Sequence, residues 1–274
     1  MNKKIAFIGT GAMGGAILQA ACRCVDPKQI TITDLDEKKA HALGETLGCA
    51  VAPSNIAAAE AADFILLCTK PQGVVDVLGE LRPALCASLA QGRPKVLCSI
   101  LAGVNIARIR AILGDAQTYP VIRLMPNTPA LIGKGVMLYT CDEFVSAEDI
   151  ADLTTLIADC GIIERLPEAM FDCATVSAGC TPAFAYLFME ALADGGVAVG
   201  LSREKALSYA AHALYGAAAM VIETGMHPGQ LKDMVTSPGG STIAGIATLE
   251  DSGVRAAAIR AVMAAYARNV EMGK

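Results

Sequence analysis

The chain has 274 residues, of which 54% are hydrophobic, and its formal net charge is -5. This length is enough for two domains, and a mean hydropathy of +0.47 indicates more apolar side chain than small surfaces need to bury, so we expect a large subunit interface. An acidic balance without any run rich in lysine and arginine argues against nucleic acid or an anionic membrane as a partner.

The first expected strand, Lys4 to Ile8, leads into a glycine-rich turn and a helix-compatible run over residues 15–21. A strand, a glycine turn and a helix in this order form the phosphate-binding end of a dinucleotide fold. Gly9 allows the tight turn, Gly11 lets the backbone approach a pyrophosphate, and Gly14 lets the helix pack closely on the strand. The alternative is a glycine turn that binds nothing. The cofactor residues predicted here are Ile8, Gly9, Thr10, Gly11, Ala12, Met13 and Gly14.

The second expected strand, Gln29 to Thr33, is followed by Asp34, twenty residues after the last glycine of the turn. An acidic side chain at this point is the expected partner of a ribose hydroxyl, whereas it would repel a 2'-phosphate. Lys38 and Lys39 lie one helical turn further on and could offset the repulsion. We therefore predict a preference for NADH over NADPH with residual use of NADPH.

The N-terminus also has the charge and apolar pattern of a signal peptide. Cleavage would remove the strand and glycine turn, and four glycines interrupt the apolar stretch, so we reject that interpretation. No uninterrupted apolar run of about 18 or more residues follows. We expect a soluble, cytoplasmic protein.

Strand and helix patterns alternate up to residue 166. The apolar run Asp63 to Thr69 is typical of a strand buried in a parallel sheet, and it stops at Lys70-Pro71-Gln72. This places Lys70 at the carboxyl end of a strand, where open α/β sheets bind ligands. The other elements expected are helices up to residue 47 and over residues 54–62, 73–89, 106–113 and 146–159, and strands over 49–51, 95–99, 119–124, 136–140 and 162–166.

Met125-Pro126-Asn127-Thr128-Pro129 breaks the chain at the carboxyl end of another strand. Asn127, between two prolines, is either a stiff turn residue or a contact to the cofactor. The sequence favours neither.

After Pro167 the strand patterns cease, and alanine-rich helices fill the chain over residues 182–199, 202–223 and 253–272. The predicted fold class is therefore α/β, with an N-terminal Rossmann-type dinucleotide-binding domain over residues 1–166 and a C-terminal all-α domain over residues 167–274.

One break in the helical part is unusual. Thr236-Ser237-Pro238-Gly239-Gly240-Ser241-Thr242 precedes a helix that we expect to begin at about Ile243. Free N-H groups and hydroxyls at the positive end of a helix form an anion site. An ordinary capped loop is the alternative.

Ten cysteines are present without a CxxC pair, and none of the three histidines has the spacing from a cysteine that zinc sites require. We therefore predict no metal site. Most of the cysteines lie in apolar contexts, which favours reduced, buried thiols that act as small hydrophobic residues.

Taken together, the glycine turn, Thr69-Lys70-Pro71, the proline-flanked Asn127 motif and Val235 to Thr242 resemble pyrroline-5-carboxylate reductase, the last enzyme of proline synthesis. The resemblance implies an N-terminal domain that binds NAD(P)H. It also implies a homodimer formed by intertwined helical domains, an active site at the dimer interface, and assembly of dimers into decamers. The further cofactor contacts that it implies are Asn55, Thr69, Lys70, Pro71 and the turn Ile100 to Ala102, with Ala102 itself among them.

One segment and one single residue depart from the family pattern. Where the family has Ser-Gly-Ser-Gly-Pro-Ala-Tyr, this chain has residues Ala178 to Phe184, a change that affects the dimer core or the pocket wall. The other is Asp34, where family members that prefer NADPH carry small polar or basic residues.

The reaction of this family requires a hydride on the C=N carbon and a proton on the nitrogen, so the site has to hold a carboxylate and orient the imine. The N-H groups of Gly240, Ser241 and Thr242 would bind the carboxylate. The hydroxyl of Thr242, the predicted catalytic group, would meet the ring nitrogen. A protonated imine is already electrophilic, so the site needs no strong general acid.

Two other interpretations remain open. A β-hydroxyacid dehydrogenase also joins such a turn to a helical domain, but it needs a lysine as general acid and base, and Lys205 and Lys232 lie in polar helix contexts. The second is a catalytically silent dinucleotide-binding redox sensor that uses its cysteines as the readout.

Overall fold

The computed structural model describes residues 2–114 and 118–272. It divides into two compact units. The first contains the residues up to Gly179 together with those from Tyr266 onwards, and the second is Cys180–Ala265. The predicted fold class is confirmed, since a sheet with helices on both faces is followed by a part that contains only helices.

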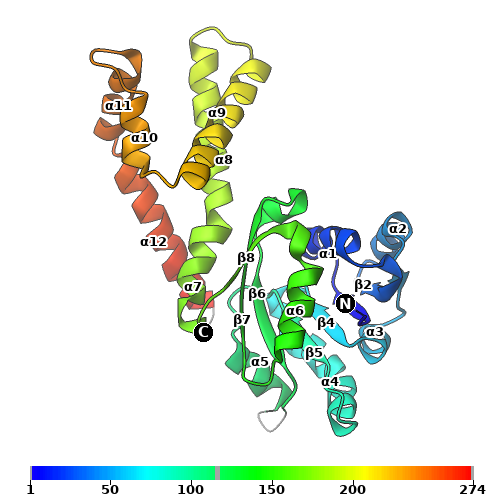
Figure 1. The fold of residues 1–274 in the computed structure, drawn as a ribbon. Coiled ribbons are helices and arrows are strands. Elements are labelled where there is room, and N and C mark those ends of the chain that lie inside the picture. The colour runs from blue at the N-terminus through cyan, green and yellow to red at the C-terminus, as the bar shows by residue number, and fades with distance from the viewer. Residues whose placement is uncertain (1, 115–117, 273–274) are drawn as a thin grey trace. The chain divides into compact units, whose positions relative to one another are not determined.

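An eight-stranded sheet forms the centre of the first unit (Figure 1), in the order β3-β2-β1-β4-β5-β6-β7-β8. Neighbouring strands are parallel except β6 and β7. Because β1 lies between β2 and β4, the strand order reverses there, and ligands bind at such switch points beside the carboxyl ends of the strands. The strands are β1 (Ile5–Ile8), β2 (Ile30–Thr33), β3 (Ala50–Val51), β4 (Phe64–Leu67), β5 (Val96–Ser99), β6 (Val121–Met125), β7 (Gly135–Cys141) and β8 (Gly161–Arg165).

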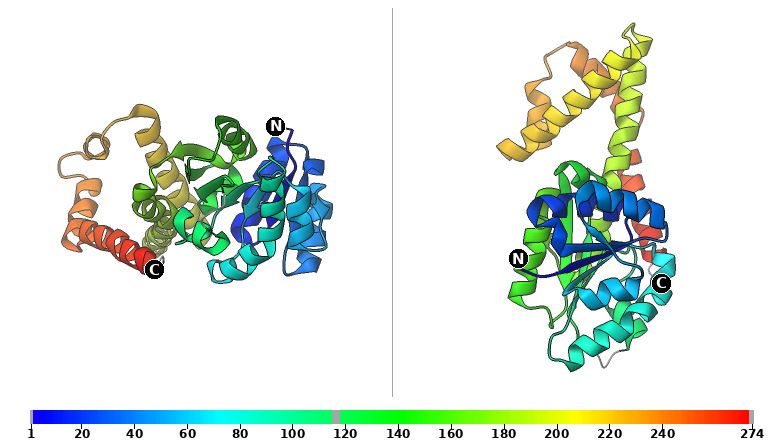
Figure 2. Two further views of the ribbon diagram at one scale, coloured as in Figure 1. Left: turned by 90° about the horizontal axis from the view of Figure 1, so that it is seen from below. Right: turned by 90° about the vertical axis from the view of Figure 1, so that its right-hand side faces the viewer.

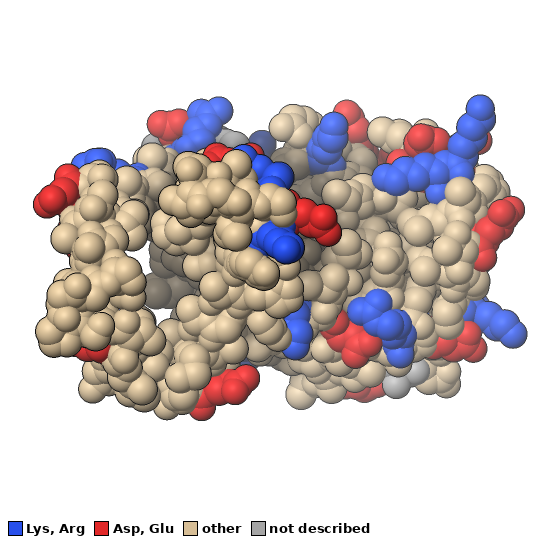
Figure 3. All heavy atoms as spheres, turned by 90° about the horizontal axis from the view of Figure 1, so that it is seen from above, with Lys and Arg blue, Asp and Glu red and all other residues tan. Residues whose placement is uncertain are grey.

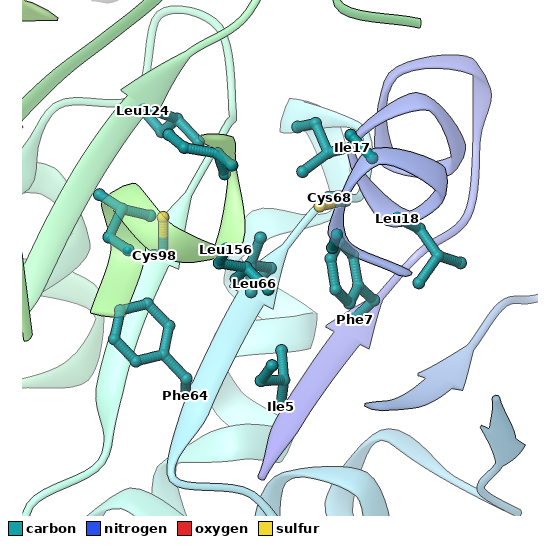
Figure 4. Packing of buried hydrophobic residues seen from close by; sticks show 14 of the residues in the cluster. Ile5, Phe7, Ile17, Leu18, Phe64, Leu66, Cys68, Cys98, Leu124 and Leu156 are labelled. Atoms are coloured by element: carbon teal, nitrogen blue, oxygen red, sulfur yellow. The ribbon is translucent and has the colours of Figure 1, made fainter. Parts of the chain in front are cut away.

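Helices cover both faces of this sheet (Figure 2). The alternation of side chains along β1 divides the core: Ile5 and Phe7 pack on one face with Ile17 and Leu18 of α1 (Figure 4), and Ile8 packs on the other. This double burial explains why the strands read as continuous apolar runs. The helices of the unit are α1 (Ala12–Cys24), α2 (Glu37–Leu47), α3 (Asn55–Ala61), α4 (Val74–Ala90), α5 (Ile106–Leu113), α6 (Ala147–Leu156) and the short α7 (Phe171–Ala174).

Polar side chains at helix starts confirm several predicted boundaries. Ser54 accepts a hydrogen bond from the N-H of Ala57 at the start of α3, and Ser146 forms a capping box with Asp149 at the start of α6. Helix α6 ends at Leu156, three residues before the predicted end, and a 3-10 turn follows it over Ala158–Cys160.

The chain contacts place the boundary between the units later than the predicted 166. Arg123 of β6 is only 4% exposed, forms ion pairs with Glu168 (3.5 Å) and Asp172 (3.4 Å), and stacks over the ring of Phe171. Asn269 also donates to the Asp172 carboxylate, at 3.2 Å. A buried guanidinium needs such partners. Because Glu168, Asp172 and Asn269 join this network, the start of the helical region and the end of α12 both belong to the unit that contains the sheet.

The second unit contains long helices, among which α8 and α9 pack side by side (Figure 1). All residues of 180–265 are described, and only Ala193, Ala206 and Ala210 are buried. Large apolar side chains are exposed instead, including Leu187 (69%) and Ile222 (81%). The helices are α8 (Thr181–Ala198), α9 (Arg203–Thr224), α10 (Pro228–Met234), α11 (Ser241–Asp251) and α12 (Val254–Met272), whose residues from Tyr266 onwards belong to the first unit.

Charged side chains of both signs are interspersed on the face drawn in Figure 3. This face therefore offers no extended basic surface to a polyanion.

Candidate active site

The glycine turn has the geometry that its sequence predicts. Gly9 has φ +95°, and a Cβ there would lie 2.8 Å from the carbonyl oxygen of Cys68. A Cβ on Gly14 would lie 2.6 Å from the carbonyl oxygen of Gly9, which confirms that α1 packs on the turn too closely for any side chain. Around Gly11, by contrast, an added Cβ would meet nothing within 4 Å. The chain thus leaves open space where a pyrophosphate would approach.

The start of α1 offers unused hydrogen-bond donors at this open point. Gly11 is the N-cap residue and makes no side-chain cap, so the first N-H groups of the helix have no acceptor within it. Thr69, at the carboxyl end of β4, adjoins the turn, and its Oγ1 is buried without a partner among the described residues. Free helix N-H groups beside an orphaned hydroxyl fit the phosphates and ribose of a dinucleotide.

The order of the strands places most of the predicted cofactor residues at one edge of the sheet, at the carboxyl ends of neighbouring strands. The turn after β1, the segment Thr69 to Pro71 after β4, and the turn at Ala102 after β5 follow the carboxyl ends of three adjacent strands. Lys70 and Ala102 are exposed, whereas Ile8 is buried in the core.

Asp34 follows β2 beside this turn, but much of its carboxylate is already engaged. Oδ2 accepts both the N-H and the hydroxyl of Thr10 at 2.7 Å, and Oδ1 accepts the N-H of Asp36 at 3.1 Å. Partial burial raises the pKa of Asp34, but these hydrogen bonds and the nearby charge of Lys39 outweigh burial and lower the pKa overall. The ionised carboxylate keeps one acceptor position on Oδ1 for a ribose hydroxyl.

Two further predicted cofactor residues have their side chains bound within the protein. Asn127 is 6% exposed, accepts the N-H of Val136 at 2.8 Å and donates to the carbonyl of Ala178 at 3.0 Å. This favours the stiff-turn interpretation over a side-chain contact to the cofactor. Asn55 accepts a hydrogen bond from Thr33 and donates one to Glu80. No local pattern marks Glu80, because it lies 25 residues from Asn55 along the chain.

The helix that follows the predicted anion site, α11, begins at Ser241, two residues earlier than expected. Gly239 has φ +67°, and a Cβ on Gly240 would lie 2.4 Å from Ser237 Oγ, so the approach to α11 is a tight turn. Gly240 forms no side-chain cap. The first N-H groups of α11 therefore have no acceptor within the helix, as an anion site requires.

One of the predicted donors is already used within the turn. The N-H of Gly240 donates to the carbonyl oxygen of Ser237 at 3.1 Å and closes the turn, so it is not available to a substrate. The donors that remain are the N-H groups of Ser241 and Thr242, with the Thr242 hydroxyl beside them.

Neither lysine considered for a β-hydroxyacid dehydrogenase lies in a buried site. Lys205 is exposed in the first turn of α9, and Lys232 pairs with the adjacent Asp233.

All ten cysteines have free thiols. Cys49, Cys68, Cys98 and Cys160 are buried, and Cys173 is exposed. Among the described residues there is no group of three or more potential ligands that could hold a metal ion.

A mostly parallel sheet with a glycine turn at its switch point, joined to a helical unit with an open helix start, defines the class of dinucleotide-dependent oxidoreductases. The family model for pyrroline-5-carboxylate reductase dimerisation matches residues 168–272, and that for NADP oxidoreductase, coenzyme F420-dependent, matches residues 4–103. The first of these begins close to the predicted domain start at 167.

Full-length relatives agree with these matches. The chain is 38% identical to the pyrroline-5-carboxylate reductase of Escherichia coli, with 100% of both chains covered, and 37% identical to that of Methanosarcina acetivorans, with 100% and 99% covered. The solved structure of the Plasmodium falciparum pyrroline carboxylate reductase with NADP bound has a TM-score of 0.89 at 31% identity and covers 100% and 99%. The chain therefore belongs to the pyrroline-5-carboxylate reductase family, as its motifs predicted.

Proposed function

We propose that this protein reduces 1-pyrroline-5-carboxylate to L-proline with NAD(P)H, the final step of proline biosynthesis. Full-length similarity to enzymes of that name carries the proposal. The open glycine turn and the uncapped start of α11 supply the two binding sites that the reaction requires. Bound NAD(P)H would provide the hydride that reduces the C=N carbon.

The first unit holds the cofactor in this proposal. The N-H groups at the start of α1 bind the pyrophosphate beside Gly11, and the hydroxyl of Thr69, which has no partner in the described part of the chain, donates to a neighbouring oxygen. Asp34 and Asn55 contact the adenosine ribose, and the chain at Lys70 and Ala102 borders the bound nucleotide.

The start of α11 holds the substrate. The N-H groups of Ser241 and Thr242 bind the carboxylate, with the positive end of the helix dipole behind them. The Thr242 hydroxyl meets the ring nitrogen and orients the imine. A protonated imine already carries positive charge on its C=N bond. Hydride transfer to it therefore depends on orientation of the two reactants and exclusion of water more than on a general acid.

A turnover assay tests this function. NAD(P)H absorbance should fall when 1-pyrroline-5-carboxylate is added, and proline should accumulate in equal amount. A β-hydroxyacid dehydrogenase would instead reduce NAD(P)+ with a 3-hydroxyacid, and a redox sensor would consume no cofactor with either compound. Either of these results would overturn the proposal.

The protein is also expected to form an obligate homodimer through residues 167–274, with the active site at the dimer interface. The second unit buries only three alanines by itself, and helices this apolar on their outer faces need a partner. Sedimentation should find no 28.2 kDa species at low concentration, and it should also show whether dimers assemble into decamers. A well-folded monomer would contradict this expectation.

Among the described residues, one helical segment, Glu168–Ala198, is long and apolar enough to cross a membrane, and 11% of its most apolar stretch is buried. A single segment of this kind is weak support for a membrane protein. A dimer interface accounts for the same exposed side chains, so our proposal keeps the protein in the cytoplasm.

We further expect NADH to be preferred over NADPH because the Asp34 carboxylate would face the 2'-phosphate. Replacing Asp34 by Ser should raise the ratio of kcat/KM for NADPH to that for NADH by about fivefold or more, the equivalent of about 1 kcal/mol of like-charge repulsion. Asp34→Asn is the control, since it removes the charge but keeps an acceptor for Thr10. If both variants lose activity equally with the two cofactors, Asp34 only supports the glycine turn through Thr10 and does not discriminate between NADH and NADPH.

A further inference from the structure

The carboxamide of Asn55 is held in one orientation by two residues from other elements. The hydroxyl of Thr33 donates to Asn55 Oδ1 at 2.7 Å, and Asn55 Nδ2 donates to Glu80 Oε2 at 2.8 Å. An ionised carboxylate can only accept hydrogen bonds. If the amide turned over, its oxygen would face the Glu80 carboxylate, so Glu80 determines which end of the carboxamide points in each direction.

Both partners have fixed backbones. Thr33 is the last residue of β2, is 5% exposed, and accepts the N-H of Gly9 on its carbonyl at 2.9 Å. Glu80 lies on α4, whose side chains Leu78 and Leu81 are fully buried in the core. The Asn55 carboxamide is therefore hydrogen-bonded on one side to Thr33, next to the glycine turn, and on the other to Glu80 on the packed helix α4.

After these two bonds, Asn55 retains one N-H and one acceptor position on its oxygen. An adenosine ribose bound next to the pyrophosphate presents hydroxyl groups. These can accept a hydrogen bond from the Asn55 N-H and donate one to the Asn55 oxygen. We propose that Glu80 is a positioning residue for NAD(P)H: it holds the Asn55 carboxamide in the orientation that serves the ribose. This inference rests on the proposed cofactor role of Asn55.

Steady-state kinetics at saturating imine tests the inference. Glu80→Ala should raise the KM for NADPH and NADH about three- to tenfold, the usual effect of losing one hydrogen bond, and leave kcat unchanged. Glu80→Gln should keep most of the affinity because its amide oxygen can still accept from Asn55. Adding Glu80→Ala to Asn55→Ala should raise KM no further than Asn55→Ala alone, since Glu80 acts through Asn55.

Asp76→Ala is the matched control, because Asp76 is an exposed acid one turn earlier on α4 and no hydrogen bond or ion pair involves its side chain in the described part of the chain. It removes the same charge and should leave KM unchanged. The inference is overturned if Glu80→Ala lowers only the melting temperature, or if it raises KM equally when Asn55 is already alanine. An unchanged KM in Asn55→Ala would instead overturn the cofactor role of Asn55, and the inference with it.

Discussion

Thr242→Ala is expected to slow imine reduction about 10- to 1000-fold while NAD(P)H affinity and stability stay unchanged. The substitution removes a hydroxyl that contacts only the substrate nitrogen in the proposed reaction. Stability should not change, because Thr242 is exposed and no residue of α11 is buried in the subunit. The measurements are kcat with 1-pyrroline-5-carboxylate, cofactor binding by fluorescence, and thermal unfolding.

Thr242→Ser provides the control for this variant, since it keeps the hydroxyl and should retain most of the turnover. The backbone N-H at position 242 is present in all three proteins. Carboxylate binding by the helix start should therefore survive, and the loss should appear in kcat more than in the KM of the substrate. Unchanged turnover in Thr242→Ala would remove Thr242 from the reaction and leave α11 with a binding role only.

Gly14→Ala should have the other large effect, on both stability and cofactor binding. The new Cβ would lie 2.6 Å from the carbonyl oxygen of Gly9 and 2.8 Å from the Cβ of Cys68, so α1 has to move away from the turn. Overpacking of this kind costs about 1–3 kcal/mol of unfolding free energy. The displaced N-H groups should also weaken NAD(P)H binding about tenfold, or about 1.4 kcal/mol. Urea unfolding and cofactor titration measure the two effects.

Gly15→Ala is the matched control, one residue further along the same helix. Its Cβ would meet only the carbonyl oxygen of Thr10, at 3.4 Å, which is ordinary contact distance. Alanine is a better helix former than glycine by about 0.5–1 kcal/mol, so this variant should be neutral or more stable. Equal behaviour of the two variants would show that the close approach at Gly14 does not limit the fold.

Much of the fold follows from short-range patterns in the sequence. Apolar runs mark the buried strands, and Ser54 and Ser146 mark helix starts, because capping depends on residues within one turn of each other. The glycine turn was predictable from its own residues, since glycine at fixed spacing between a strand and a helix marks the conformation, although its close contact with Cys68 comes from the end of another strand. These local signals, combined with the Val235 to Thr242 motif, were sufficient to identify the family.

Only the tertiary structure decided how distant residues divide their hydrogen bonds. It places Asn127 against Val136 and Ala178, ties Asp34 to Thr10, and joins Asn55 to Glu80, and in each case the partner comes from another element. The ion pairs of Arg123 likewise extend the sheet unit to Gly179, beyond the point where the strand pattern ends. A sequence shows which groups can donate or accept, but the partner that saturates each group depends on which elements the fold packs together.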